Sequence, residues 1–202
     1  MKRLLVVALF ISALSLPALA QTSNASQASA QSGCMCIENS FAQTPCAQRE
    51  SAKPAAKEFA ARREIQKRID ETIEADKARD VDGATRYDLP EFTVKNLDGS
   101  VDTREDARKG IKQGYQYILK VTDETYVKID CLTLKGREAT VYINQHFVRT
   151  MPDRKNGSPH TVITNITHKE DWVRTSKGWM RRRIDELQRG PSFLDGKPFN
   201  PN

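Results

Sequence analysis

Beyond its first 20 residues, the 202-residue sequence lacks any apolar run long enough to cross a membrane. A membrane-spanning helix needs about 20 consecutive apolar residues. The later sequence also contains no internal repeat. The length and the ordinary content of charged residues, 29%, fit one domain with an extension.

The sequence also lacks a long block of lysine and arginine. Its formal net charge is +6, but acidic and basic residues are interspersed along the chain. The densest basic run, residues 181–183, falls in a predicted strand, where successive side chains point to opposite faces. A single basic patch is therefore not expected, and nucleic acid is not an expected partner.

Histidine is scarce, and its spacing does not favour a metal site. The three histidines are His146, His160 and His168. None stands in the His-x-x-x-His spacing on a helix that is typical of zinc enzymes. We expect neither a metal nor a cofactor.

The N-terminus, in contrast, has the pattern of a secretory signal peptide. Lys2 and Arg3 precede an apolar segment, residues 4–16, and the segment 18–20 supplies a small-x-small cleavage site. We expect cleavage after Ala20 and export to the periplasm or the medium, with no membrane association of the mature chain. An uncleaved N-terminal anchor is the alternative.

Residues 21–54 are rich in serine, alanine and glutamine and predict a disordered or disulfide-stapled lead-in. Cys34, Cys36 and Cys46 lie in this segment. Because oxidation is expected outside the cytoplasm, we favour a disulfide from Cys46 to Cys34 or Cys36 over a metal or redox site. Cys131 falls in a predicted strand and is expected to be a small buried core residue.

Residues 55–80 predict a long helix. Ile65, Ile69 and Ile73 stand four residues apart and therefore stack along one face, while the other faces are charged. This apolar stripe has to pack on another element, because one helix has no core of its own. A second helix is predicted over residues 104–119.

The rest of the folded part predicts strands. They cover residues 91–95, 101–103, 125–134, 138–150, 160–174 and 179–187. Long strands joined by short turns form an antiparallel meander, whose apolar face the helices would cover. The prediction is an α+β domain over residues 55–188, with a curved sheet around the long helix and a cone-shaped cavity. Residues 189–202 are expected to form an irregular tail.

This order of elements resembles the nuclear transport factor 2-like superfamily. Residues 75–83 resemble the end of its first helix, and Phe92 followed by residues 98–100 and 104–105 resembles a pattern of SnoaL-like and DUF4440-type members. Residues 167–174 and 178–186 resemble their last two strands. The resemblance covers about residues 60–188. It implies a cone-shaped fold but does not fix a function.

The same superfamily includes ketosteroid isomerase-like enzymes, whose site can be compared with this sequence. The resemblance places their general-base aspartate at Asn96 and their oxyanion-hole tyrosine near Thr72. An amide cannot take a proton as a carboxylate does. A threonine hydroxyl is also a shorter donor than a phenol. Both departures argue against ketosteroid isomerase chemistry.

Other polar and aromatic side chains in the predicted strands are candidates to line the cavity. The pocket candidates are Tyr142, His146, His168, Trp172, Trp179 and Arg183, and the catalytic candidates are His146, His168 and Asp185. A cavity lined by such groups can bind a polar ligand or support acid–base catalysis. We favour the alternative that these are ordinary sheet residues in cross-strand pairs, because no nucleophile–base spacing is visible.

Three functions fit these observations. The first, which we prefer, is an exported, non-catalytic SnoaL-like domain that binds a small molecule in its cone or a partner through its sheet. The second is an isomerase, lyase or hydrolase, which requires at least two of His146, His168 and Asp185 to point into one apolar cavity. The third is an interaction module that forms a homodimer through an apolar sheet face.

Overall fold

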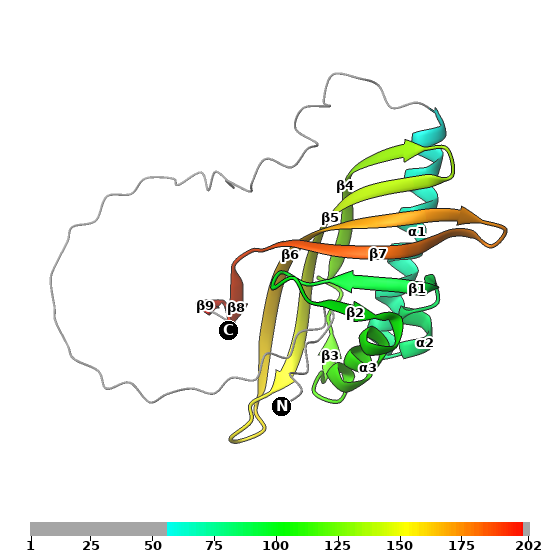
Figure 1. Ribbon diagram of the computed structural model, residues 1–202. Helices are drawn as coiled ribbons and strands as arrows, with labels where there is room; N and C mark the ends of the chain where they lie inside the picture. The colour runs from blue at the N-terminus through cyan, green and yellow to red at the C-terminus, as the bar shows by residue number, and fades with distance from the viewer. Residues whose placement is uncertain (1–55, 200–202) are drawn as a thin grey trace, which may run out of the picture.

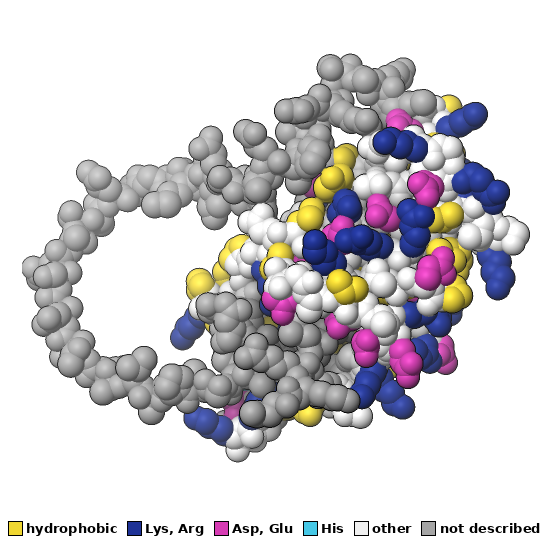
Figure 2. Space-filling model, in the orientation of Figure 1, with side chains coloured by type: hydrophobic (Ala, Val, Ile, Leu, Met, Phe, Trp, Pro, Cys, Tyr) yellow, Lys and Arg dark blue, Asp and Glu magenta, His cyan; other side chains and the backbone are white. Residues whose placement is uncertain are grey.

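The computed structural model describes residues 56–199. The predicted signal peptide, the whole lead-in and the disulfide expected among Cys34, Cys36 and Cys46 lie outside the described residues. Within residues 56–199, no helix is long and apolar enough to cross a membrane. Figure 2 shows acidic and basic side chains interspersed over the displayed face of this part.

The described chain forms a long helix, two shorter helices and a strongly curved sheet (Figure 1). The helices are α1 (Ala56–Ala78), α2 (Val81–Ala84) and α3 (Arg104–Tyr115). The strands are β1 (Asp88–Lys95), β2 (Val101–Thr103), β3 (Lys120–Val121), β4 (Tyr126–Lys135), β5 (Glu138–Pro152), β6 (Pro159–Thr175), β7 (Gly178–Arg189), β8 (Ser192–Leu194) and β9 (Lys197–Phe199). The helix α1 runs across one face of the sheet, and α2 and α3 lie near the C-terminal end of α1 (Figure 1).

The strands follow the order β2-β1-β7-β6-β5-β3, with β4 paired to β5 and the β8–β9 hairpin attached to β6. The strands β4 to β7 form the predicted antiparallel meander. The strand β1 instead runs parallel to β7, which brings the first hairpin beside the last long strand. Register shifts interrupt the β4–β5 and β6–β7 pairings, and such bulges bend strands. The sheet therefore curves around α1.

The isoleucine stripe of α1 forms the centre of the core, as predicted. Ile65, Ile69 and Ile73 are buried, and they pack with inward-facing residues of the sheet such as Val141 and Trp172. Complete burial of an aliphatic side chain stabilises a fold by roughly 1.5–3 kcal/mol. The stripe therefore fixes which face of α1 meets the sheet, and with it the direction of neighbouring polar residues.

The second helix begins where the sequence indicates but ends earlier. The Thr103 side chain accepts from the backbone N–H of Asp106, whose carboxylate accepts from the Thr103 backbone in return, so the two form a capping box. The helix α3 ends at Tyr115 and not at residue 119. The reason is that the Leu119 N–H donates to the Thr150 carbonyl, which starts the pairing of β3 with β5.

The tail after residue 188 is more ordered than predicted. It forms β8 and β9, which turn at Asp195 and Gly196, both with positive φ (49° and 76°). Asp-Gly is the sequence that such two-residue hairpin turns favour. His160 Nδ1 lies 2.5 Å from Asp195 Oδ2, so the turn is also fastened to β6. The expectation of an irregular tail was wrong because the Asp-Gly signal was overlooked.

Cys131 also differs from its prediction. A register shift lies between Ile129 and Cys131 in the pairing with β5. The alternation therefore moves by one residue, and Leu132 takes the buried position while Cys131 is half-buried. Cys131 is in addition disulfide-bonded, so it is not a free thiol in the core.

Candidate functional site

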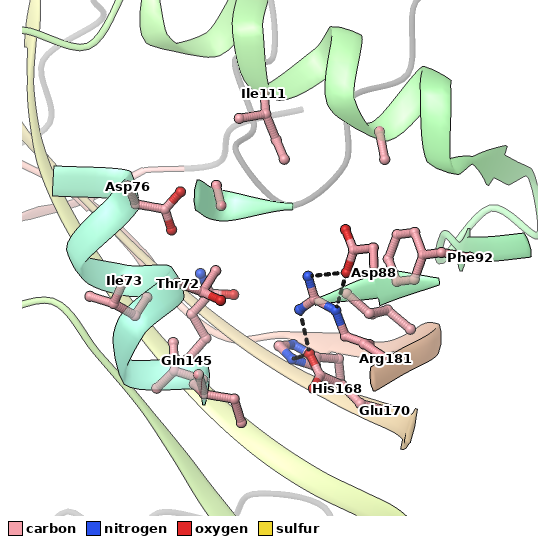
Figure 3. A pocket seen from close by; sticks show the side chains of 15 residues that line it. Thr72, Ile73, Asp76, Asp88, Phe92, Ile111, Gln145, His168, Glu170 and Arg181 are labelled. Atoms are coloured by element: carbon pink, nitrogen blue, oxygen red, sulfur yellow. Dashed lines mark hydrogen bonds and ion pairs between the residues drawn. The ribbon is translucent and has the colours of Figure 1, made fainter. Parts of the chain in front are cut away.

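A cavity of about 80 Å³ lies inside the curve of the sheet, between α1, α3 and the inner faces of β6 and β7 (Figure 3). It is smaller than the roughly 300–1,000 Å³ typical of sites for drug-sized ligands. Its walls are mostly apolar but carry five ionisable side chains. The lining residues are Ile69, Thr72, Ile73, Asp76, Ala84, Asp88, Phe92, Ala107, Ile111, Val127, Gln145, His168, Glu170, Arg181 and Ile184.

Arg181 holds two carboxylates on one side of the cavity. The parallel pairing of β1 with β7 places Asp88 opposite Arg181. Arg181 Nε donates to Asp88 Oδ1 at 2.8 Å, and Arg181 Nη1 donates to Glu170 Oε1 at 3.0 Å. Burial alone would lower the pKa of Arg181, but Asp88 and Glu170 raise it above its ordinary value. Arg181 is therefore a fixed positive charge.

Glu170 is a fixed negative charge. It is only 2% exposed, and burial alone would raise its pKa. The nearby Arg181 guanidinium, together with His168 and Trp172, nevertheless lowers the pKa to about 2. Trp172 Nε1 donates to Glu170 Oε2 at 2.8 Å, and His168 Nε2 lies 3.3 Å from Glu170 Oε1. The pKa of Asp88 instead moves upward, because burial outweighs its pairing with Arg181.

Asp76 has the opposite electrostatic environment, on the α1 side of the cavity. It is 8% exposed and sits in the last turn of the helix, where the helix dipole disfavours a negative charge. Burial raises its pKa to about 6, although the hydrogen bond from Tyr115 and the charge of Arg181 act to lower it. The Tyr115 hydroxyl donates to Asp76 Oδ1 at 2.5 Å. The other carboxylate oxygen makes no hydrogen bond to residues 56–199.

Only one of the three catalytic candidates from the sequence lines this cavity. His168 does, next to Glu170. His146 stacks on Tyr126 with ring centroids 5.0 Å apart and contacts Asn165, its partner across the β5–β6 pairing. Asp185 is paired with Lys169 at 2.9 Å and does not line the cavity. The requirement that two of these residues share one cavity is therefore not met here.

The predicted pocket residues are also divided. Trp172 and Trp179 are both 1% exposed and belong to the core beside α1, where Trp172 supports Glu170 and not the cavity wall. Arg183 pairs with Asp185 at 2.5 Å, and neither it nor Tyr142 lines the cavity.

The two positions compared with ketosteroid isomerase-like enzymes are also separated. Thr72 lines the cavity, but its hydroxyl donates to the Arg68 carbonyl at 3.0 Å. Asn96 does not line the cavity; its amide donates to Ser100 and Asp102 within the β1–β2 hairpin.

Sequence reasoning did not single out Asp76, Asp88 or Tyr115, and it considered Arg181 only as part of a basic run. A signal existed for Asp76, because it stands three residues after Ile73 and thus on the buried face of α1. A carboxylate on such a stripe is a candidate for a functional site. Within residues 56–199, no group of three or more histidine, cysteine, aspartate or glutamate side chains could hold a metal ion.

The sequence matches no known family and no curated protein. Solved structures, however, share its architecture. A candidate scytalone dehydratase from Novosphingobium aromaticivorans has a TM-score of 0.58 at 10% identity, over 67% of this chain and 87% of that one. This chain has the NTF2-like fold. A nuclear transport factor 2 (NTF2-like) superfamily protein from Salmonella enterica has a TM-score of 0.52 at 17% identity, over 65% of this chain and 93% of that one.

A third structure, the Kfla4162 protein from Kribbella flavida, has a TM-score of 0.56 at 12% identity and covers 67% of this chain and 94% of that one. The NTF2-like fold and the curved sheet around the first helix are therefore confirmed. At these identities the likeness concerns the fold alone. The DUF4440-type resemblance stays a prediction.

Proposed function

We propose that the cavity binds a small organic molecule and moves a proton on it, as isomerases and lyases do. Asp76 is the acid–base group in this proposal. The observation that carries it is the position of Asp76: a buried carboxyl at the cavity wall, with one oxygen unbonded and a pKa raised to about 6. A general base is most effective when its pKa lies near the working pH.

The contrast between two carboxyls in one cavity supports this assignment. The pKa of Asp76 is raised to about 6, whereas that of Glu170 is lowered to about 2. Environments that drive the pKa values of neighbouring groups apart are typical of acid–base sites. In the proposed division of roles, Asp76 exchanges the proton and Tyr115 positions Asp76. The Arg181–Glu170 pair keeps His168 in place at the wall.

The proposal replaces pure ligand binding as the preferred function. Burial disfavours the ionised form of Asp76 and brings its pKa to about 6, close to the working pH of a general base. It also differs from ketosteroid isomerase chemistry, because the base lies on α1 and not at Asn96. The fold neighbour described as a candidate dehydratase is in keeping with this reaction class.

Hydrogen–deuterium exchange at carbon tests the proposal without a known substrate. The protein in D₂O would be incubated with a ketone, an aldehyde, a nitroalkane and an α-amino ketone, each of three to five heavy atoms, and exchange would be followed by proton NMR. We expect faster exchange of at least one compound, at a rate that rises as the pH increases through about 6. Asp76→Asn should slow it on the order of 100-fold or more.

The matched control is Asp70→Asn, which removes the same charge from an exposed position of α1. This variant should exchange protons like the unmodified protein. Equal rates for Asp76→Asn and Asp70→Asn, or no catalysed exchange with any compound, would contradict the proposal.

A further inference from the structure

The charges around the cavity do not balance. Among the described residues that line it, Asp76, Asp88 and Glu170 can each carry a negative charge, and only Arg181 and His168 can carry a positive one. One negative charge is therefore uncompensated even when His168 is protonated and all three carboxyls are ionised. The remaining wall is largely apolar, so this charge is weakly screened.

The positive groups are not available to a ligand. Arg181 is bonded to Asp88 on one side and to Glu170 on the other. His168 lies against Glu170, 3.3 Å from its carboxylate. An anionic ligand would have to separate one of these buried pairs, which leaves a buried carboxylate without a partner. Breaking such a pair is strongly unfavourable.

The negative group on the opposite wall is available. Asp76 uses one carboxylate oxygen for the Tyr115 hydroxyl and has no partner in residues 56–199 for the other. Its side chain is more than nine-tenths buried, and it points from α1 into the cavity (Figure 3). Gln145 lines the same cavity and contributes an amide oxygen that can accept a further N–H.

We infer that the cavity takes a small organic cation, with an ammonium, amidinium or guanidinium group that donates to Asp76. The inference rests on the proposed function in that it names the substrate class of the same site. Charge-assisted hydrogen bonds of this kind are about twice as strong as neutral ones. The volume of about 80 Å³ restricts the ligand to a few heavy atoms.

A positive charge on the substrate also fits the proposed proton transfer. When a C–H bond beside the cationic nitrogen breaks, the proton goes to the Asp76 carboxylate and the electron pair stays on carbon. A positive charge near that carbon stabilises the negative charge that develops there. The two cationic side chains in the described lining are held by carboxylates, so the substrate supplies this charge itself.

The test uses three probes of nearly the same shape and different charge: acetamidinium, acetamide and acetate. Each would be titrated into the full chain at pH 8 and followed by backbone amide NMR shifts. We expect millimolar affinity for acetamidinium, at least tenfold tighter than for acetate, with acetamide between them. Because ionised Asp76 is required, affinity for acetamidinium should fall as the pH drops below about 6.

The other charged and titratable groups that face the cavity are held in hydrogen bonds or ion pairs. They are Tyr115 of α3, Asp88 of β1, His168 and Glu170 of β6, and Arg181 of β7. Asp76→Asn should abolish the preference for acetamidinium, and Asp70→Asn should leave it unchanged. Equal losses in the two variants would indicate surface attraction and overturn the inference.

Tighter binding of acetate, or no saturable binding of acetamidinium, would also overturn it. The acetamidinium titration and the exchange experiment test the cation site and the proposed enzyme activity separately. Acetamidinium that binds through Asp76 without any catalysed exchange at carbon supports the cation site and rejects the enzyme. Catalysed exchange of neutral compounds without acetamidinium binding supports the enzyme and rejects the cation site.

Discussion

Asp76→Asn is expected to make the protein more stable at pH 8 while it removes proton transfer. The pKa of Asp76 is about 6 in the folded protein, against the ordinary aspartate value of 3.8 in the unfolded chain. The raised value means that the folded protein holds this proton more tightly than the unfolded chain. The stability it confers is complete below about pH 4 and is lost as the pH rises through about 6. At pH 8 the buried carboxylate is therefore a net cost.

Asparagine removes this cost and keeps an oxygen that accepts from Tyr115. Each pKa unit corresponds to about 1.4 kcal/mol, so we expect a gain in the free energy of unfolding of roughly 1–3 kcal/mol at pH 8. For a domain of this size that corresponds to a rise in Tm of about 2–4 °C per kcal/mol. The gain should shrink steadily when the measurement is repeated at pH 6, 5 and 4.

Denaturant unfolding of the protein, Asp76→Asn and Asp70→Asn over this pH range checks the prediction. Asp70 is exposed, so its variant should follow the unmodified protein at every pH. A variant that is more stable and yet catalytically silent is typical of a residue kept for function. A loss of stability in Asp76→Asn that does not change with pH would make Asp76 a structural tie to Tyr115 instead.

Arg181→Met is expected to cause the largest loss of stability at the site. Arg181 lies between Asp88 and Glu170, which are 5% and 2% exposed. Methionine has a similar length but leaves both carboxylates buried without their cation. Removing one partner of a buried ion pair costs about 3–5 kcal/mol. The guanidinium also lies 5.2 Å from the centre of the Phe92 ring, and this contact is lost as well.

The loss should depend on pH in a defined direction. The pKa of Glu170 is lowered in the folded protein, to about 2 from 4.5, so its contribution is present above about pH 4.5 and disappears only toward pH 2. Without Arg181 this carboxyl takes a proton far more readily. The difference in the free energy of unfolding between the protein and Arg181→Met should therefore be largest at pH 7 and smaller at pH 4–5.

Two companion variants separate this explanation from a general effect of removing arginine. Arg182→Met removes a neighbouring arginine whose pair with Glu138 is solvent-exposed, and such pairs contribute about 0–1 kcal/mol. The triple variant Asp88→Asn, Glu170→Gln and Arg181→Met should recover part of the loss because no buried charge remains. If Arg181→Met and Arg182→Met are equally stable, the buried network does not hold the site together.

The fold could be predicted because its signals are local. The spacing of Ile65, Ile69 and Ile73 gives the buried face of α1, and alternation along β5 gives the inner face of the sheet. Short turns between long strands predict that each strand pairs with the next one along the chain, which is a meander. These patterns are confirmed, and with them the curved sheet around the first helix.

The site could not be predicted in the same way because it depends on pairings between distant segments. Asp88 and Arg181 are 93 residues apart, and their contact requires the parallel pairing of β1 with β7. The register of β5 and β6 also determines which face of the sheet each histidine occupies. His168 lies opposite the buried Ile143, whereas His146 lies opposite Asn165. The two histidines therefore belong to opposite faces of the sheet, which no spacing within one strand reveals.

The most direct test is a carbon NMR titration of the Asp76 carboxyl, with Asp76→Asn used to assign the signal. The account predicts a midpoint near pH 6, well above the ordinary aspartate value of 3.8. It also predicts that acetamidinium shifts this midpoint downward, because a bound cation favours the carboxylate. A midpoint at or below pH 4 would contradict the central claim, because Asp76 would then be an ordinary carboxylate without a pKa suited to proton transfer.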